Sequence, residues 1–107
     1  MNRVHSFSAE KQINKFSPIV HNFEDPDQLI RLISELQSLA MSCPASVPLF
    51  ISVDQEGGRV ARLKSPFSIF PQPSCLGRAR SESLAQRFGL ALGQEMQAVG
   101  INMVYAP

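Results

Sequence analysis

Apolar side chains recur along this chain at helical spacing in one long stretch. From Leu29 to about Met41 they return every three or four residues, a pattern that predicts an amphipathic helix. Asp25 is placed to cap its start and Pro26 to occupy its first position. The apolar stripe consists of Leu29, Ile30, Leu32, Ile33, Leu36, Leu39 and Ala40.

A second helical pattern lies near the end of the chain. It begins near Ser81 or Ser83, and Gly100 follows it where glycine commonly ends a helix. Residues 64–73, ahead of it, are rich in proline and serine and are predicted to be irregular. The apolar positions of this helix are Leu84, Phe88, Ala91, Leu92, Met96 and Val99.

Two shorter apolar runs predict strands. The run Val47–Val53 is almost continuously apolar, which is typical of a parallel strand covered on both faces. Ile101–Tyr105 follows the second helix and predicts another short strand. The order strand, helix, strand therefore predicts an α/β fold with a parallel sheet.

Polar groups gather directly after the first predicted strand, in the string VDQEGGRVARL of residues 53–63. Asp54 would stand at the strand end, where α/β folds meet their ligands. Its oxygens could accept hydroxyl donors from a polyol, or they could cap a following turn. Gly57 and Gly58 would let a ligand approach the backbone, although an ordinary turn needs the same residues.

Two arginines complete this segment. Arg59 and Arg62 lie three positions apart, and their planar donor groups suit a carboxylate, a phosphate or sugar oxygens. Surface ion pairs with Glu56 or Asp54 are the alternative. A phosphate loop is disfavoured because no lysine and serine follow the glycines at the required spacing.

The same string resembles the amino-terminal domain of family 3 glycoside hydrolases. It is followed by Phe70-Pro71, by Gly93-Gln94-Glu95-Met96 and by the run from Gly100 to Pro107, and together these look most like bacterial β-N-acetylglucosaminidases, or β-hexosaminidases, which act on cell-wall muropeptides. The resemblance covers about residues 19–107. It leaves residues 1–18 as a poorly defined amino-terminal segment, in which Lys15–His21 departs from the glycine-containing apolar strand of the family.

This resemblance implies a fold and an activity. The fold would be α/β, a partial (β/α)₈ TIM barrel containing only its opening βα units. The activity would be retaining hydrolysis of terminal β-N-acetylhexosamine residues, as in peptidoglycan recycling. Asp54 and Arg62 would bind the N-acetylglucosamine-containing saccharide. The residues expected to structure the loop are Glu56, Gly57, Gly58 and Arg59, with Glu56 pairing to an arginine or accepting backbone donors.

No catalytic residue is expected within the chain itself. By resemblance, the aspartate nucleophile, a lysine-histidine motif and the acid/base histidine lie further along family members, and a complete barrel needs about 250 residues. Asp54 and Glu56 are not expected to form the carboxylate pair of a retaining enzyme, because they should point to different sides as the chain leaves the strand. We therefore expect a fragment that is inactive and aggregation-prone alone, with the missing carboxyl-terminal portion of the barrel as its possible partner. The alternative is a non-catalytic remnant, or a module that binds a saccharide or a partner without cleaving it.

Composition and charge add few functional possibilities. The chain of 107 residues has a net charge of +1, with 44% apolar and 18% charged residues, so neither a nucleic acid nor a membrane is an expected partner. No cofactor is expected. Two cysteines without CxxC spacing and two isolated histidines give no metal site. Met1–Lys15 shows no apolar secretory signal, so a cytoplasmic location is expected.

Overall fold

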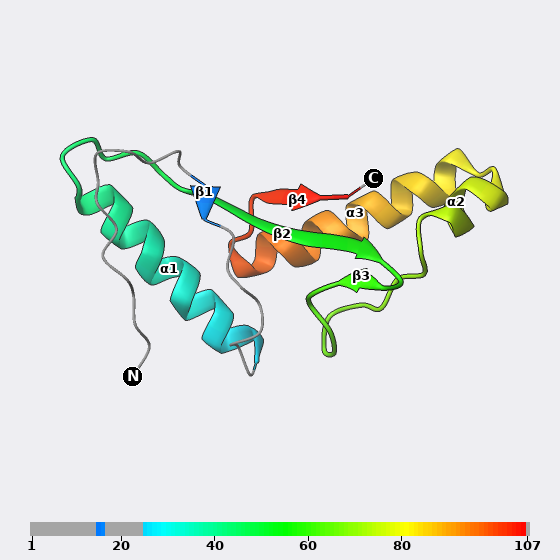
Figure 1. Cartoon of the computed structure of the whole chain (residues 1–107), viewed down its shortest axis with the longest axis horizontal. Coiled ribbons are helices and arrows are strands. Elements are labelled where there is room, and N and C mark those ends of the chain that lie inside the picture. Colours follow the sequence, from blue (N-terminus) through cyan, green and yellow to red (C-terminus); the bar gives the residue numbers. More distant parts are fainter. Residues whose placement is uncertain (1–14, 17–24, 107) are drawn as a thin grey trace.

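Helices and strands alternate along the part of the chain that this computed structural model describes, residues 15–16 and 25–106. Within these residues the arrangement is mixed α/β, as the sequence predicts (Figure 1). In chain order the elements are β1 Lys15–Phe16, α1 Pro26–Ser42, β2 Phe50–Gly57, β3 Val60–Ala61, α2 Ser74–Ala79, α3 Glu82–Val99 and β4 Met103–Tyr105.

Strand β2 is the centre of the sheet. Both β1 and β4 run parallel to it, and β3 turns back to pair antiparallel with its end. Helix α1 lies in the connection from β1 to β2, and α3 lies in the connection that leads to β4. These are the parallel βα connections that the predicted alternation requires.

The ends of both long helices are set by the residues that the sequence singles out. The Asp25 side chain accepts a hydrogen bond from the backbone N–H of Gln28 at 2.8 Å, and Ser81 caps α3 by accepting from the N–H of Leu84. At the other end of α3, Gly100 adopts φ 94°, a left-handed conformation that ends the helix at little cost for glycine. All three boundary predictions are confirmed.

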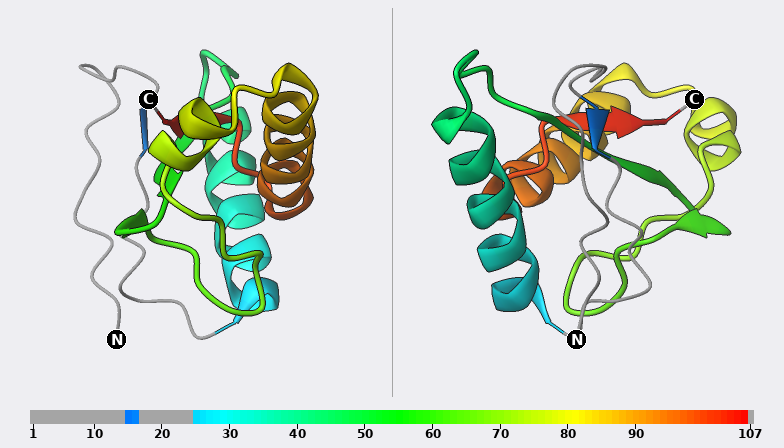
Figure 2. Two further views of the ribbon diagram at one scale, coloured as in Figure 1. Left: turned by 90° about the vertical axis from the view of Figure 1, so that its right-hand side faces the viewer. Right: turned by 60° about the vertical axis from the view of Figure 1, so that its left-hand side comes forward.

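The hydrophobic core lies between the two long helices and one face of β2. Both helices are on the same side of this strand (Figure 2). The buried apolar residues are Leu29 and Ile33 of α1, Ile51 and Val53 of β2, Leu92, Met96 and Val99 of α3, and, outside these elements, Leu63, Phe67 and Ile101. The scaffold is therefore held together by burial on one side of the sheet.

The predicted apolar stripe of α1 is wider than the face that the helix buries. Leu29 and Ile33 are buried, whereas Ile30, Leu32 and Leu39 are exposed. In the described part of the chain, Leu29 and Ile33 are the α1 residues that belong to the core shared with β2 and α3. The stripe is therefore only partly covered by the described residues.

Strand β2 starts and ends later than predicted. The side chain of Gln37 bonds both the N–H and the C=O of Leu49, so the backbone before Phe50 is satisfied by a helix side chain and not by a strand. At the other end, pairing with β3 continues the strand to Gly57. Asp54 consequently lies inside the strand and not at its end, which corrects the predicted boundary.

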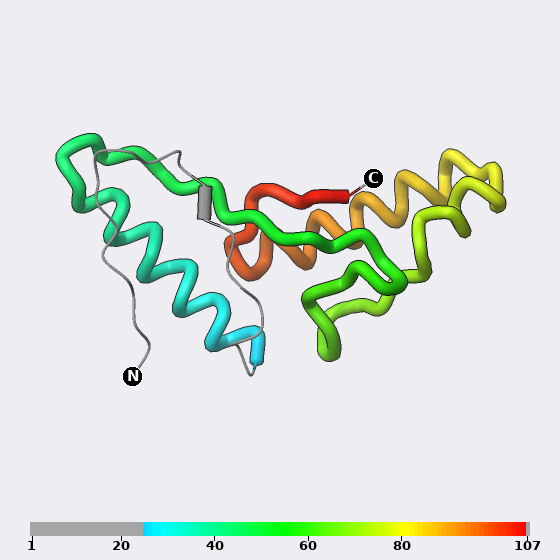
Figure 3. The backbone as a smooth tube through the Cα atoms, in the orientation of Figure 1, coloured from blue at the N-terminus to red at the C-terminus, as the bar shows by residue number. Residues whose placement is uncertain are grey.

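Other elements also differ from the sequence prediction. Neither the short helix α2 nor strand β3 is predicted, and the tube of Figure 3 follows the chain from β2 through β3 and the irregular segment to α2. Strand β4 is shorter than expected because the Asn102 side chain bonds the backbone of Ile51 and Leu49 ahead of it.

Lys15–Phe16 forms a parallel strand although this region departs from the family pattern. The remaining residues of the predicted amino-terminal segment, 1–14 and 17–18, lie outside the described part.

Candidate functional site

The two faces of β2 differ in what they carry. Side chains alternate between faces along a strand, and Ile51, Val53 and Gln55 are buried on the side of the helices. Asp54 belongs to the opposite face, and its side chain is 51% exposed. The strand thus presents a carboxylate to solvent from a backbone that the core holds in place.

The buried side chain of Gln55 fastens the next part of the chain to this strand. Its Oε1 accepts hydrogen bonds from the N–H groups of Arg62 and Leu63 at 2.8 and 3.0 Å, and its Nε2 donates to the Leu63 carbonyl at 3.0 Å. Gln55 is 2% exposed, so these bonds satisfy an amide that water barely reaches. The backbone that carries Arg62 is therefore fixed beside Asp54.

A tight turn joins the two strands of this hairpin. Gly57 and Gly58 have φ values of 105° and 61°, which glycine adopts readily. A Cβ on Gly57 would lie 2.3 Å from the carbonyl oxygen of Pro71, and the Gly58 N–H donates to the carbonyl of Phe70 at 2.9 Å. The predicted structuring role of both glycines thus has a clear cause, because segment 70–72 packs directly on the turn.

Asp54 and Arg62 meet across this hairpin. Arg62 Nη2 lies 3.9 Å from Asp54 Oδ2, and the two side chains are 46% and 51% exposed. Within the described residues neither side chain makes a hydrogen bond. An exposed pair of this kind contributes about 0–1 kcal/mol to stability, so its polar atoms are free to bind a ligand.

Tyr105 is a neighbour of this pair that the sequence analysis does not assign to the site. The parallel register of β2 and β4 places it opposite Asp54, and it is 43% exposed. Paired residues of adjacent strands lie on the same face of the sheet. The available signal was that Tyr105 ends the next parallel strand, at the edge where Asp54 also lies.

The chain matches proteins of known family along most of its length. The model of the glycosyl hydrolase family 3 N terminal domain matches residues 5–107. The chain belongs to glycoside hydrolase family 3. The resemblance inferred from the sequence is therefore confirmed.

Similar proteins cover this family 3 chain but extend far beyond it. Beta-hexosaminidase from Idiomarina loihiensis is 36% identical over 92% of the chain and 30% of its own length. Beta-hexosaminidase A from Pseudoalteromonas piscicida is 36% identical over 80% of the chain and 15% of its own length. A glycoside hydrolase family 3 beta-N-acetylglucosaminidase from Paenibacillus sp. str. FPU-7 superposes with a TM-score of 0.79 at 39% identity, covering 87% of the chain and 18% of that protein. The chain thus spans less than a third of the length of each of these relatives.

The structure gives Glu56 a different place from the one predicted for it. Between the paired positions Gln55↔Ala61 and Gly57↔Val60, Glu56 is the extra residue of a bulge. Among the residues described, it accepts no hydrogen bond and forms no ion pair. The predicted pairing of Glu56 with an arginine or with backbone donors is therefore wrong, and Gln55 is the residue that braces the loop.

The chain direction around these residues also differs from the expectation. Asp54 and Glu56 both lie within β2, so the chain does not leave the strand at these residues as the sequence predicts. The bulge interrupts the alternation of side chains at Glu56, and the divergence of the two carboxylates stays a prediction. Arg59 is exposed in the turn, and its predicted structuring role has no contact to support it within the described part.

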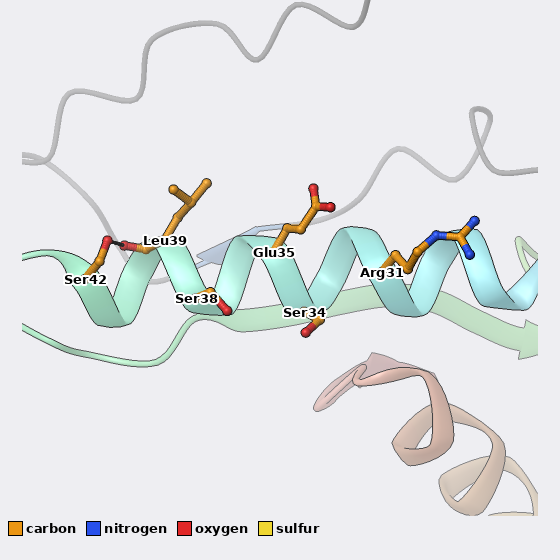
Figure 4. A pocket seen from close by; sticks show the side chains of 6 residues that line it. All are labelled: Arg31, Ser34, Glu35, Ser38, Leu39 and Ser42. Carbon is orange, nitrogen blue, oxygen red and sulfur yellow. Dashed lines mark hydrogen bonds between the residues drawn. The ribbon is translucent and has the colours of Figure 1, made fainter.

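Two hollows of the family 3 chain lie away from Asp54 and Arg62. The first is lined by α1 side chains, whose arrangement Figure 4 shows: Arg31, Ser34, Glu35, Ser38, Leu39 and Ser42. The second lies between the irregular segment, α2 and α3, and is lined mainly by apolar side chains. The first consists of exposed side chains spread along a single helix, and neither hollow lies where the parallel strands end, so the Asp54–Arg62 pair remains the candidate site.

Metal and membrane chemistry are not indicated within residues 15–16 and 25–106. No three His, Cys, Asp or Glu side chains are grouped there so that they could hold a metal ion. No helix in the same ranges is long and apolar enough to cross a membrane. The chemistry that the described site offers is hydrogen bonding between charged side chains and a polar ligand.

Proposed function

We propose that this chain supplies the sugar-binding pair of a β-N-acetylhexosaminidase, with Asp54 and Arg62 gripping a terminal N-acetylglucosamine residue. One observation carries the proposal. The two predicted binding residues, eight positions apart in sequence, converge to 3.9 Å on the face of β2 that points away from the helices. Tyr105 borders the same face.

The chemistry of the pair suits a sugar. The Asp54 carboxylate accepts hydrogen bonds from two hydroxyl groups, and the Arg62 guanidinium donates to ring or hydroxyl oxygens. Because the ion pair is long and exposed, little free energy is lost when a saccharide replaces it. Charge-assisted hydrogen bonds to the ligand are then stronger than the contact they displace.

Bond cleavage would depend on groups outside these 107 residues. The described site has the acceptor and donor for binding but no general acid placed opposite a nucleophile, as a retaining glycosidase requires. The chain would therefore bind the sugar without cleaving it unless the remainder of a barrel completes the site. Opening βα units of a (β/α)₈ barrel, completed by such a remainder, are the architecture that we propose.

A chimeric enzyme tests this proposal. Residues 5–107 would replace the matching segment of the Idiomarina loihiensis β-hexosaminidase, and turnover of 4-nitrophenyl N-acetyl-β-glucosaminide would be measured. We expect the chimera to be active and Asp54→Ala to lower kcat/KM at least about a hundredfold, the effect of losing two hydrogen bonds to a charged group. Glu35→Ala, which removes an exposed carboxylate from α1, is the matched control and should retain activity. A chimera in which Asp54→Ala is as active as the parent contradicts the assigned role.

A non-catalytic role is the second candidate, because the described pair offers a hydrogen-bond acceptor and donor for a sugar but no acid opposite a nucleophile. In that case the 107-residue chain binds N-acetylglucosamine but shows no turnover, alone or in the chimera. The chimera assay separates the two functions, because only the first predicts cleavage.

We also propose a role in recycling cell-wall fragments in the cytoplasm. The support for the recycling role is that similar proteins are named beta-hexosaminidase; the location is carried over from the sequence expectation. Cell fractionation with an antibody to the chain, and accumulation of N-acetylglucosamine-containing muropeptides after gene deletion, test the two parts separately.

A further inference from the structure

A carboxylate outside the proposed sugar-binding pair fastens the irregular segment that packs on the hairpin. Glu95 of α3 accepts the backbone N–H of Ser68 with both carboxylate oxygens, at 3.0 and 3.1 Å, and it also accepts the Ser68 hydroxyl. The two residues are 27 positions apart. Hydrogen bonds to an ionised carboxylate are stronger than neutral ones, so this contact acts as a clamp between α3 and the segment.

The Glu95–Ser68 clamp lies in a part of the irregular segment that is only partly buried. Ile69, directly after Ser68, is 83% exposed, whereas Phe67 before it is buried. The ring of Phe70 stacks edge-on against Phe88 of α3 with centroids 4.9 Å apart. Between these two aromatic anchors, only the Glu95 contacts tie the described backbone to the helix.

This segment in turn sets the turn of the hairpin. The Phe70 carbonyl accepts the N–H of Gly58, and Pro71 lies so close to Gly57 that a Cβ there would collide with it. Arg62 directly follows β3, the returning strand of the same hairpin. Contacts therefore lead from Glu95 through segment 68–71 to the turn at Gly57 and Gly58, and the backbone of the hairpin leads from that turn to Arg62.

We propose that Glu95 is a positioning residue for the sugar-binding pair. Its carboxylate holds segment 68–71 against α3, and that segment fixes the turn at Gly57 and Gly58 and thereby the approach of Arg62 to Asp54. The inference rests on the proposed function only for its last step, the effect on the saccharide. The clamp itself is testable without any ligand.

The first experiment measures local opening in the 107-residue chain by amide hydrogen exchange. Glu95→Ala should speed exchange of the Gly58 N–H about tenfold, since the loss of a charged hydrogen-bond partner frees the segment. The Asn102 N–H, which donates to the Ile51 carbonyl in the scaffold, should keep its rate. Gln94→Ala on the same helix is the matched control, because the Gln94 side chain is exposed and makes no hydrogen bond to any described residue. Equal acceleration at Gly58 and Asn102 means general destabilisation and overturns the proposal, as does no change at Gly58.

The second experiment observes the pair directly. The ¹H–¹⁵N resonance of Arg62 Nε should shift in Glu95→Ala and return towards the parent position in Glu95→Gln, which keeps an acceptor for the Ser68 N–H. An unchanged resonance in Glu95→Ala overturns the positioning role.

Titration with N-acetylglucosamine completes the test. We expect Glu95→Ala to raise Kd about tenfold, for the same lost hydrogen bonds, and Glu95→Gln to restore it. If the parent chain binds no saccharide, the proposed function fails, while the exchange and resonance results still decide whether Glu95 positions Arg62. If the parent binds and Glu95→Ala binds equally well, the positioning role is wrong and the proposed function stands.

Discussion

The two faces of β2 have different roles, although their residues alternate along one strand: one face is buried in the core and the other carries the proposed binding residues. On the helix side, Ile51 is fully buried and Val53 nearly so, at 0% and 1% exposure, in contact with both long helices. On the open side, Asp54 is half exposed beside Arg62 and Tyr105. Burial of the apolar side chains fixes the backbone of β2. The fixed backbone then presents the Asp54 carboxylate to solvent, where a ligand can reach it. Stability and binding should therefore respond to different substitutions within four consecutive residues.

The largest effect is expected on the helix side. Ile51→Ala should lower the free energy of unfolding by about 2–5 kcal/mol, because it leaves a cavity in the core. A small domain has only about 5–15 kcal/mol in total. Among the described residues β4 pairs with β2 alone, and an open sheet edge of this kind places the chain towards the low end of that range. Urea titration followed by circular dichroism measures the change.

Ile51→Val serves as the control, with an expected loss of about 0.5–1.5 kcal/mol. Equal midpoints for Ile51→Ala and the parent chain would show that the described core does not hold the strand.

The next effect comes from the residue that links the two faces. Gln55→Ala should cost about 2–3 kcal/mol, because it leaves buried backbone groups of Arg62 and Leu63 without partners. It should also abolish saccharide binding, since Arg62 is no longer held beside Asp54. Unfolding and saccharide titration are measured on the same sample.

Gln37→Ala is the matched control for that change. Gln37 also bonds both backbone groups of one residue, Leu49, but it lies away from the hairpin. We expect a loss of stability without loss of binding. Loss of binding in Gln37→Ala as well would mean that binding merely follows stability.

A pair of glycines sharpens the comparison at the turn. Gly57→Ala should cost about 1–2 kcal/mol because its φ of 105° and the nearby Pro71 carbonyl both oppose a side chain. Gly89→Ala, in the middle of α3 with open space around it, should instead stabilise the chain by about 0.5–1 kcal/mol. Thermal melts of both variants check the opposite signs, and a loss in both would contradict the local explanation.

Much of the scaffold could be predicted because its signals are local. Asp25, Ser81 and Gly100 mark helix ends by their own hydrogen bonds and backbone conformation, and each is found where expected. The approach of Asp54 to Arg62 agrees with the site expected from the family resemblance. Their role in binding a saccharide stays a prediction until it is measured.

What the sequence could not supply depends on contacts between distant segments. The brace by Gln55 requires the backbone of residues 62 and 63 to return beside β2, and Leu49 leaves the strand because Gln37 on α1 reaches it. No regular spacing in the sequence predicts that Gln55 bonds residues 62 and 63, or that Gln37 bonds Leu49. The exposed part of the α1 stripe was likewise unpredictable, because periodicity reports which residues share a face and not how much of that face a neighbour covers.

The smallest effect on stability is expected at the site itself. Asp54→Ala should change the free energy of unfolding by no more than about 0.5 kcal/mol, as is usual for an exposed side chain. Urea titration against the parent chain measures it. A loss as large as that of Ile51→Ala would place Asp54 in the scaffold and remove the distinction between the two faces.

Saccharide binding by the parent chain and by Asp54→Ala is the most direct test of the proposed site. In a ¹H–¹⁵N titration with N-acetylglucosamine, we predict saturable shifts in residues 54–62 and at Tyr105 in the parent chain, and their loss in a folded Asp54→Ala variant. Identical titration curves for the two chains, or no shifts at this face of β2, would contradict the assignment of Asp54 and Arg62 as the sugar-binding pair.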